Sequence, residues 1–360
     1  MYNKKKNTCG TFDVLTTGVH LAALIMGLGA AMTAAAAPLE PKAYVSNGGP
    51  GTVSGIMFFP PSPPSVVSTT GVGRFPQGVA VSPDGTRIYV ANMGATSGSG
   101  TLSVINAAVT PPSVTATVRV GGFPSAVAVA PGGTKVYVTN SFSNTVSVIN
   151  AQSSPPAVKT TVAVGKGPTG VAVSPDGKRV YVANSSANTV SVINATKLTP
   201  SVSATVVVGI GSNGVAVSPD GKRVYVANQS SDTVSVIDTT TTPPSVAATV
   251  AFETNTFPFQ LVFSPDGTRV YVANAGGGVW VVDATANPPS RLTFITVGAG
   301  PSGIAITPDG AVVYVVNNGV SSVSLISTIS NSVVATIPVG TNPSSVGIIP
   351  PPSNTAATGD

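Results

Sequence analysis

The chain has very few of the side chains that enzymes most often use for nucleophilic and acid–base chemistry. Its 360 residues include one cysteine, Cys9, and one histidine, His20. Both precede residue 37, so the rest of the chain has no thiolate, disulfide or imidazole. Ser–His and Cys–His catalysis needs these groups, and zinc, copper and haem sites typically use them. The composition therefore favours a non-enzymatic protein with no catalytic residue, metal site or cofactor.

Charged residues are also scarce. They make up 8% of the chain, compared with about a quarter in an average protein. The formal net charge is +5, and it falls to about +3 if residues 1–36 are removed. Phosphate binding needs clustered cations, so this charge makes nucleic-acid binding an unlikely function.

The amino-terminal segment has the layout of a secretory signal peptide. Three lysines, Lys4 to Lys6, precede an apolar run from Val19 to Met32, and small residues follow it. The alternative is an uncleaved anchor, because residues 19–37 could just span a bilayer. The many Ala and Gly residues favour cleavage. We expect residues 1–37 to be the signal peptide and the mature protein to be a monomer without stable membrane insertion, located in the periplasm or secreted to the cell surface.

One tetrad occurs seven times: a tyrosine, a valine, a small residue and an asparagine. The copies begin at Tyr44, Tyr89, Tyr137, Tyr181, Tyr225, Tyr271 and Tyr314, at intervals of 43 to 48 residues. This period is too long for one hairpin and is typical of one four-stranded propeller blade.

The repeat around Tyr181 shows the expected blade. An apolar strand at 170–173 leads into the turn Ser-Pro-Asp-Gly at 174–177, where Pro fixes φ and Gly can adopt a positive φ. Further strands are expected at 178–183, 189–193 and 203–208, rich in β-branched residues. Four such strands with short connections predict an antiparallel meander.

The chain ends predict how the ring closes. Residues 43–46 match a second strand with no first strand before it, and residues 346–349 match a first strand with no second strand after it. Pairing the two segments removes both unpaired edges. The sequence therefore predicts an all-β, seven-bladed propeller over residues 38–350, followed by a disordered tail at 351–360.

These tetrads, the Ser-Pro-Asp-Gly turns and the segment Val-Ala-Thr-Ile-Pro-Val-Gly at 334–340 resemble the YVTN-family, YncE-like β-propeller repeat. The resemblance covers nearly all of residues 43–349 and implies an exported seven-bladed propeller. It is poorly specific for function, because relatives include cell-surface and surface-layer proteins, periplasmic proteins of unclear role and haem-binding domains of some nitrite reductases.

Residues that recur in every blade are expected to be structural. The asparagines that end the tetrads can cap turns; the alternative is a polar ring around a channel entrance. They are Asn47, Asn92, Asn140, Asn184, Asn228, Asn274 and Asn317. The turn aspartates are expected to form turns; the alternative, a ring of Ca²⁺ ligands, lacks the clustered carboxylates of known sites. They are Asp84, Asp176, Asp220, Asp266 and Asp309. Only Asp232 and Glu253 depart from the repeat's acids, and they are expected in different blades and loops.

A localised site is expected where the blades differ, on the face that carries the inter-blade loops. Several phenylalanines and two cations fall in loops on this face, and they suggest an aromatic ligand platform. The alternative is that Phe beside Pro plugs gaps between blades. The candidate ligand-binding residues are Arg74, Phe75, Phe123, Phe142, Lys166, Phe257 and Phe259.

The leading hypothesis is an exported, non-enzymatic binding or scaffold protein whose partner is an unknown envelope protein, a peptide or a glycan. Three alternatives remain open. They are a structural, surface-layer-like component, a metal-dependent lactonase or other hydrolase, and a single-stranded nucleic-acid binding protein.

Overall fold

The computed structural model describes residues 43–59 and 62–350. Residues 1–39 and 40–360 fall in two separate units, and the described residues all belong to the second. The predicted signal peptide and the predicted tail at 351–360 lie outside the described residues. Within the described part, the only helical segments are the short 3-10 turns η1 (Gln229–Ser231) and η2 (Asn318–Val320), and no helix is long and apolar enough to cross a membrane.

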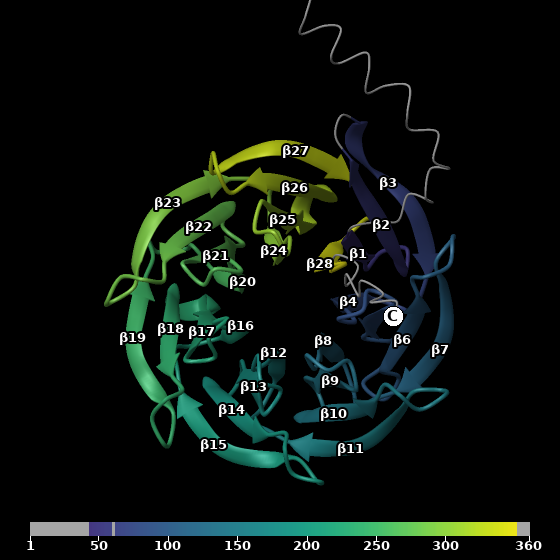
Figure 1. Ribbon diagram of the computed structural model, residues 1–360, viewed down its shortest axis with the longest axis horizontal. Helices are drawn as coiled ribbons and strands as arrows, with labels where there is room; N and C mark the ends of the chain where they lie inside the picture. The colour runs from purple at the N-terminus through teal and green to yellow at the C-terminus, as the bar shows by residue number, and fades with distance from the viewer. Residues whose placement is uncertain (1–42, 60–61, 351–360) are drawn as a thin grey trace, which may run out of the picture. The chain divides into compact units, whose positions relative to one another are not determined.

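The described residues form seven antiparallel sheets of four strands, arranged in a ring (Figure 1). The innermost strands are β4 (Pro76–Val81), β8 (Pro124–Val129), β12 (Pro168–Val173), β16 (Ser212–Val217), β20 (Pro258–Phe263), β24 (Pro301–Ile306) and β28 (Pro343–Ile348). The second strands are β1 (Ala43–Asn47), β5 (Arg87–Asn92), β9 (Lys135–Asn140), β13 (Arg179–Asn184), β17 (Arg223–Asn228), β21 (Arg269–Asn274) and β25 (Val312–Asn317).

The third strands are β2 (Thr52–Phe59), β6 (Thr101–Asn106), β10 (Thr145–Asn150), β14 (Thr189–Asn194), β18 (Thr233–Asp238), β22 (Gly278–Asp283) and β26 (Ser322–Ser327). The outermost strands are β3 (Ser62–Gly71), β7 (Ser113–Arg119), β11 (Ala157–Ala163), β15 (Ser201–Val207), β19 (Ser245–Ala251), β23 (Ser290–Thr296) and β27 (Ser332–Pro338). The predicted seven-bladed all-β propeller is confirmed, and the four strands predicted around Tyr181 begin and end within two residues of β12 to β15.

The Ser-Pro-Asp-Gly turn connects the first and second strands of a blade through side-chain hydrogen bonds. In the turn before β13, the Ser174 hydroxyl donates to Asp176 Oδ1 at 2.6 Å and accepts the Arg179 N–H at 2.9 Å. Gly177 adopts a φ of 69°, which glycine tolerates without steric cost. The hydrogen bond from Ser174, followed by one from the Lys178 N–H, holds the pKa of Asp176 below its usual value.

The ring closes where the two ends of the described chain pair. Strand β28 is antiparallel to β1, with Ala43 opposite Ile348, Tyr44 opposite Gly347 and Val45 opposite Val346. The first blade therefore takes its innermost strand from the carboxy-terminal part of the chain, as the sequence predicts, in the order β28-β1-β2-β3. Because β28 and β1 pair with each other, neither strand is left without a neighbour.

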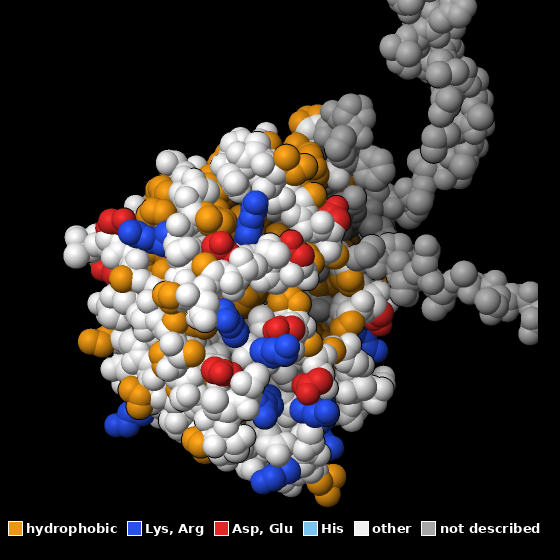
Figure 2. All heavy atoms as spheres, turned by 60° about the vertical axis from the view of Figure 1, so that its left-hand side comes forward, with side chains coloured by type: hydrophobic (Ala, Val, Ile, Leu, Met, Phe, Trp, Pro, Cys, Tyr) orange, Lys and Arg blue, Asp and Glu red, His pale blue; other side chains and the backbone are white. Residues whose placement is uncertain are grey.

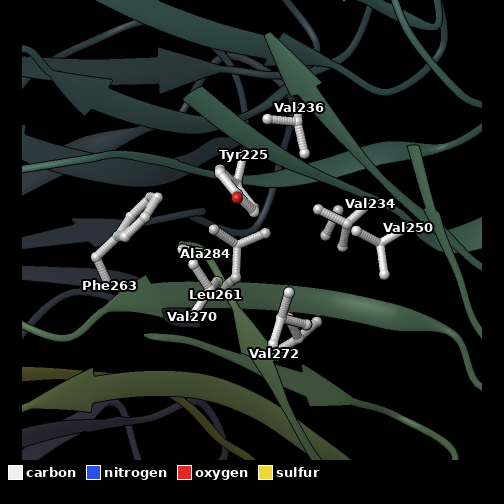
Figure 3. Packing of buried hydrophobic residues seen from close by; sticks show 11 residues of the cluster. Tyr225, Val234, Val236, Val250, Leu261, Phe263, Val270, Val272 and Ala284 are labelled. Atoms are coloured by element: carbon white, nitrogen blue, oxygen red, sulfur yellow. The ribbon is translucent and has the colours of Figure 1, made fainter. Parts of the chain in front are cut away.

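The hydrophobic core is divided among the blade interfaces. Seven clusters of buried side chains each join two neighbouring blades. In the cluster shown in Figure 3, Tyr225 and Val236 of one blade face Leu261, Phe263 and Val270 of the next. The seven tetrad tyrosines are all fully buried in these interfaces. Strands that are apolar on both faces are thus a consequence of each blade lying between two others.

A basic side chain at the start of the second strand links each of five blades to the next one. Arg179, for example, donates to the Thr239 carbonyl of the following blade at 2.9 Å, and Lys135 donates to the Ala195 carbonyl at 2.9 Å. Arg87, Arg223 and Arg269 make the equivalent contact. These cations therefore stabilise the ring and are not free to form a surface patch.

Candidate functional site

A central channel runs between the innermost strands. Its cavity of about 560 Å³ is lined by residues of all seven blades. In each blade the second residue of the innermost strand reaches the cavity, and six of these seven side chains are neutral and polar. The seven are Gln77, Ser125, Thr169, Asn213, Phe259, Ser302 and Ser344.

Small residues next to this ring let the innermost strands approach one another closely. A Cβ added to Gly170 would lie 2.2 Å from the Asn213 carbonyl oxygen, and one added to Gly214 would lie 2.8 Å from the Gln260 Cα. Real Cβ atoms cannot approach the backbone this closely. Four blades have glycine at this position, whereas the sheet of β20 has Gln260, whose carboxamide lines the channel.

The hydroxyl groups of the ring are held by the neighbouring blade. Ser125 donates to the carbonyl oxygens of Pro168 and Thr169, each at 3.1 Å, and Ser302 donates to the Ser344 carbonyl at 3.2 Å. A donating hydroxyl keeps its lone pairs and can accept a hydrogen bond from a ligand.

Two carboxamides of the channel differ from these hydroxyls. The side chains of Asn213 and Gln260 make no hydrogen bond with any other residue in the described part of the chain. Asn213 is buried, with 9% of its surface exposed. Both lie on innermost strands of adjacent blades, β16 and β20, so their N–H groups are available to a molecule in the channel.

The channel wall is uncharged. None of its lining residues is Asp, Glu, His, Lys or Arg. Across the described ranges 43–59 and 62–350, no group of three or more His, Cys, Asp or Glu side chains could hold a metal ion. The arrangement can therefore bind a neutral polar ligand and donate hydrogen bonds to its oxygens.

The predicted aromatic residues are divided among several places. Phe259 alone lines the channel, and Phe123 contacts Phe142 edge to face at a centroid distance of 5.6 Å. Arg74 lies over the Phe75 ring at 5.7 Å, and Lys166 is exposed without a described partner. Within the described residues no ring contact joins Phe75, Phe257 or Phe259 to the Phe123–Phe142 pair.

Three of these phenylalanines share an unusual backbone conformation. Phe75, Phe123 and Phe257 precede the first proline of an innermost strand with φ values of 51°, 49° and 52°. Three other blades, those of β12, β16 and β24, have Gly167, Gly211 and Gly300 directly before the innermost strand. A bulky residue in the left-handed region costs about 1 kcal/mol or more, which the packing of the loop must offset.

The tetrad asparagines are buried, and none of them lines the channel. Asn184 illustrates the usual pattern, in which Nδ2 donates to Thr189 Oγ1 at 3.1 Å and to Ser191 Oγ at 3.0 Å on the third strand. A glycine of the preceding inter-blade loop lies against the amide, because a Cβ on Gly165 would be 2.7 Å from Asn184 Cγ. The asparagine thus connects three segments of chain.

The two acids that depart from the repeat lie closer together than the sequence suggested. Asp232 is in the loop between β17 and β18, and its carboxylate accepts the N–H groups of Asn255 at 2.9 Å and Phe257 at 2.7 Å. Its carbonyl also accepts the Phe252 N–H at 2.9 Å, directly before Glu253. The two acids lie in different loops, as expected, but the inter-blade segment that carries Glu253 folds back over the Asp232 loop. Glu253 forms an ion pair with Arg291.

The outer surface matches the low charge of the sequence. Figure 2 shows charged side chains scattered singly or beside a charge of opposite sign, on a surface that is otherwise mostly uncharged. The ion pairs Lys178–Asp176 and Lys222–Asp220 are exposed, and their atoms are 3.7 and 4.0 Å apart.

Sequence reasoning missed the channel residues Asn213 and Gln260. The sequence does indicate these two residues, because they occupy the second and third positions of the innermost strand, where the repeats can be compared with one another. At the third position four repeats have glycine and one has Gln260.

The ring and its neutral channel define a seven-bladed β-propeller with a central ligand cavity. The family model of the YNCE-like beta-propeller matches residues 179–277, and the model "Lactonase, 7-bladed beta-propeller" matches residues 93–208. The predicted YncE-like resemblance is thereby confirmed. No curated protein matches the sequence.

Several solved structures have the same fold. Hydrazine synthase of Kuenenia stuttgartiensis is similar with a TM-score of 0.68 and 24% identity, over 76% of this chain and 90% of that one. A periplasmic gluconolactonase of Pseudomonas aeruginosa has a TM-score of 0.71 and 18% identity, over 85% and 98%. A candidate 6-phosphogluconolactonase of Bacteroides uniformis has a TM-score of 0.73 and 19% identity, over 84% and 98%. At these identities the likeness establishes the fold.

The expectation of a non-enzymatic binding or scaffold protein is corrected by these matches. The match of the family model "Lactonase, 7-bladed beta-propeller" to residues 93–208 favours the hydrolase alternative. The expectation relied on the absence of cysteine and histidine, which excludes thiolate and imidazole chemistry. It does not exclude ester hydrolysis promoted by hydrogen-bond donors, because amide N–H groups can stabilise an oxyanion.

Proposed function

We propose that this protein is a lactonase-like hydrolase that binds a neutral sugar lactone in the central channel and promotes its ring opening. The observation that carries the proposal is the uncharged, polar channel wall with two free carboxamides, Asn213 and Gln260. A sugar lactone presents several hydroxyl groups, one ring ester and no charge, so it matches this wall in chemistry. The lactonase match over residues 93–208 includes the strands that carry Ser125 and Thr169.

The chemistry would depend on hydrogen-bond donation to the ester. Attack of water on the lactone carbonyl forms a new C–O bond and places negative charge on the carbonyl oxygen. When this intermediate collapses, the ring C–O bond breaks, the ring oxygen takes one proton of the water, and the acid that forms releases the other. The Nδ2 group of Asn213 and the Nε2 group of Gln260 would donate to the carbonyl oxygen. The serine and threonine hydroxyls that line the channel would orient the sugar. One such donor contributes about 10²- to 10³-fold in rate. The wall has no carboxylate or imidazole to act as general base, so we expect a modest rate enhancement.

The neutral wall also favours an unphosphorylated substrate. A phosphate group is normally bound by Arg, Lys or a cluster of N–H groups, and no cation lines the channel. Arg74 and Lys166 lie in exposed inter-blade loops. We therefore expect glucono-δ-lactone to be preferred over its 6-phosphate. Export through the predicted signal peptide is part of the same proposal and is supported by the sequence of residues 1–37.

The test is proton release from glucono-δ-lactone, measured against the spontaneous rate, with 6-phosphogluconolactone in parallel. Asn213→Ala and Gln260→Ala should each lower kcat/KM by about 10- to 1,000-fold. Gln152→Ala, an exposed glutamine outside the channel, is the matched control and should have no effect. A rate equal to the spontaneous one for both lactones would refute the proposed activity, and a preference for the phosphorylated lactone would refute the assignment of a neutral substrate.

A further inference from the structure

One blade departs from the repeat at several positions that meet in space. The third strand, β22, has Trp280 where the six other blades have a serine, and Gly278 where they have Thr or Ser. The outer strand, β23, has Phe294 where the others have threonine. The preceding inter-blade loop has Glu253 where the others have the glycine that covers the tetrad asparagine.

These changes open a pocket of about 280 Å³, here called the Trp280 pocket. It is lined by Glu253, Asn255, Thr256, Asn274, Gly276, Trp280 and Phe294. It shares no lining residue with the central channel.

The pocket has an aromatic wall. The rings of Trp280 and Phe294 are 5.1 Å apart at an angle of 56°, and Phe252 stacks with Trp280 at 5.9 Å and 27°. One side of this group packs against the core cluster between β16–β19 and β20–β23. The Phe294 ring remains 43% exposed. Gly278 is required here, because a Cβ would lie 2.2 Å from Phe294 Cζ.

Polar groups surround the aromatic wall. Arg291 lies over Trp280, with Cζ 5.0 Å from the ring centroid, and pairs with Glu253 Oε1. The Glu253 side chain is 61% exposed, so its carboxylate can accept further hydrogen bonds. Hydrogen bonds from its own backbone N–H and from Arg291 hold the pKa of Glu253 below its usual value, so it is an ionised acceptor at neutral pH.

The tetrad asparagine of this blade has lost its usual partners. Asn274 Nδ2 donates to the Val272 carbonyl at 2.8 Å, and the hydroxyl acceptors found in the other blades are missing because of Gly278 and Trp280. Its Oδ1 has no hydrogen-bond partner among the described residues, although 99% of the residue is buried. The other six asparagines also have an unpaired Oδ1, but each is covered by a glycine. Asn274 instead lines the pocket.

We propose that the Trp280 pocket is a second binding site, specific for a neutral pyranose ring. A pyranose has a face of C–H groups that can stack on the Phe294 and Trp280 rings, and a rim of hydroxyls that can donate to the Glu253 carboxylate. Small-molecule sites combine an apolar wall with a few convergent polar groups in the same way. The pocket is at the lower end of the usual size range, about 300 to 1,000 Å³, so it suits one ring.

Other ligand classes fit less well. A cationic ligand would have to displace Arg291 from both Trp280 and Glu253. A nucleic acid would bring phosphates next to the Glu253 carboxylate, and the one nearby cation is already paired. An apolar ligand would cover the Glu253 carboxylate without donating a hydrogen bond to it.

The test uses Trp280, the only tryptophan of the chain, as its reporter. The full-length protein is titrated with methyl β-D-glucopyranoside, methyl β-D-galactopyranoside and the methyl β-glycoside of N-acetylglucosamine. A ligand of this size with ordinary efficiency should bind with a Kd of about 1 mM and change the fluorescence saturably. Glu253→Gln should weaken binding about fivefold or more.

A second variant restores the residues of the other blades. Trp280→Ser combined with Phe294→Thr should fold, because six blades carry these residues, and should abolish binding measured by saturation-transfer NMR. The control variant Leu198→Ala, at an exposed loop residue outside both the channel and the Trp280 pocket, should bind the sugar as the parent does. The proposal is overturned if no glycoside gives a saturable change up to about 50 mM, or if the restored double variant binds as well as the parent.

Discussion

Removal of the last fifteen residues should open the ring. The deletion of 346–360 takes away the part of β28 that pairs with Ala43, Tyr44 and Val45. Val346 is buried, and burial of a side chain of this size contributes about 1.5 to 3 kcal/mol. With the partly buried Ile348 and about three backbone hydrogen bonds of roughly 1 kcal/mol each, the expected loss is about 5 to 8 kcal/mol.

This loss is comparable to the whole free energy of unfolding of a typical domain, about 5 to 15 kcal/mol. The deletion also exposes the inner edge of β1, which can pair with a second molecule. We therefore expect a much lower urea midpoint and larger species in size-exclusion chromatography. Deletion of residues 351–360 is the control, since it leaves β28 intact. A truncated protein that stays monomeric and unfolds within about 1 kcal/mol of the parent would refute this account of ring closure.

Three further predictions concern stability. Gly165→Ala should cost about 1 to 3 kcal/mol, because its Cβ would lie 2.7 Å from Asn184 Cγ, whereas the control Gly132→Ala, with open space around it, should be neutral or slightly stabilising in urea unfolding. Arg179→Met removes one blade-to-blade hydrogen bond and should lower the free energy of unfolding by about 1 to 2 kcal/mol; an unchanged value would show that these links are dispensable. Burial, followed by the charge of Asp309, raises the pKa of Tyr314 to about 12, so its contribution of about 3 kcal/mol should be full below pH 10 and lost as the pH approaches 12. Urea unfolding at intervals over that range checks this, and a flat profile would contradict it.

The repeat made the fold predictable from residues alone. Most copies carry their own turn chemistry, as in Ser174 to Gly177, and all carry β-branched strands, so local preferences agree with the period from blade to blade. The pairing of the chain ends followed from counting strands, because an unmatched strand at each end leaves a complementary edge.

The candidate site was less predictable, because contacts between blades are not local in the sequence. The phenylalanines expected to form one platform lie apart from one another, because the backbone of each loop or strand sets the position of its own side chain. The loop after β19 folds back onto the Asp232 carboxylate, as the equivalent loops fold back onto Asn144 and Asn188, and this long-range contact is seen only in the assembled blades.

The sequence by itself therefore determined the number of blades, their strand order and the way the ring closes, because these depend on short-range pattern and repetition. Only the tertiary structure decided which side chains face the channel without partners and which ones open the Trp280 pocket. The channel site depends on residues of adjacent blades, such as Asn213 and Gln260, and the Trp280 pocket joins an inter-blade loop that carries Glu253 to the blade that carries Trp280. These contacts between segments distant in the sequence are properties of the folded ring.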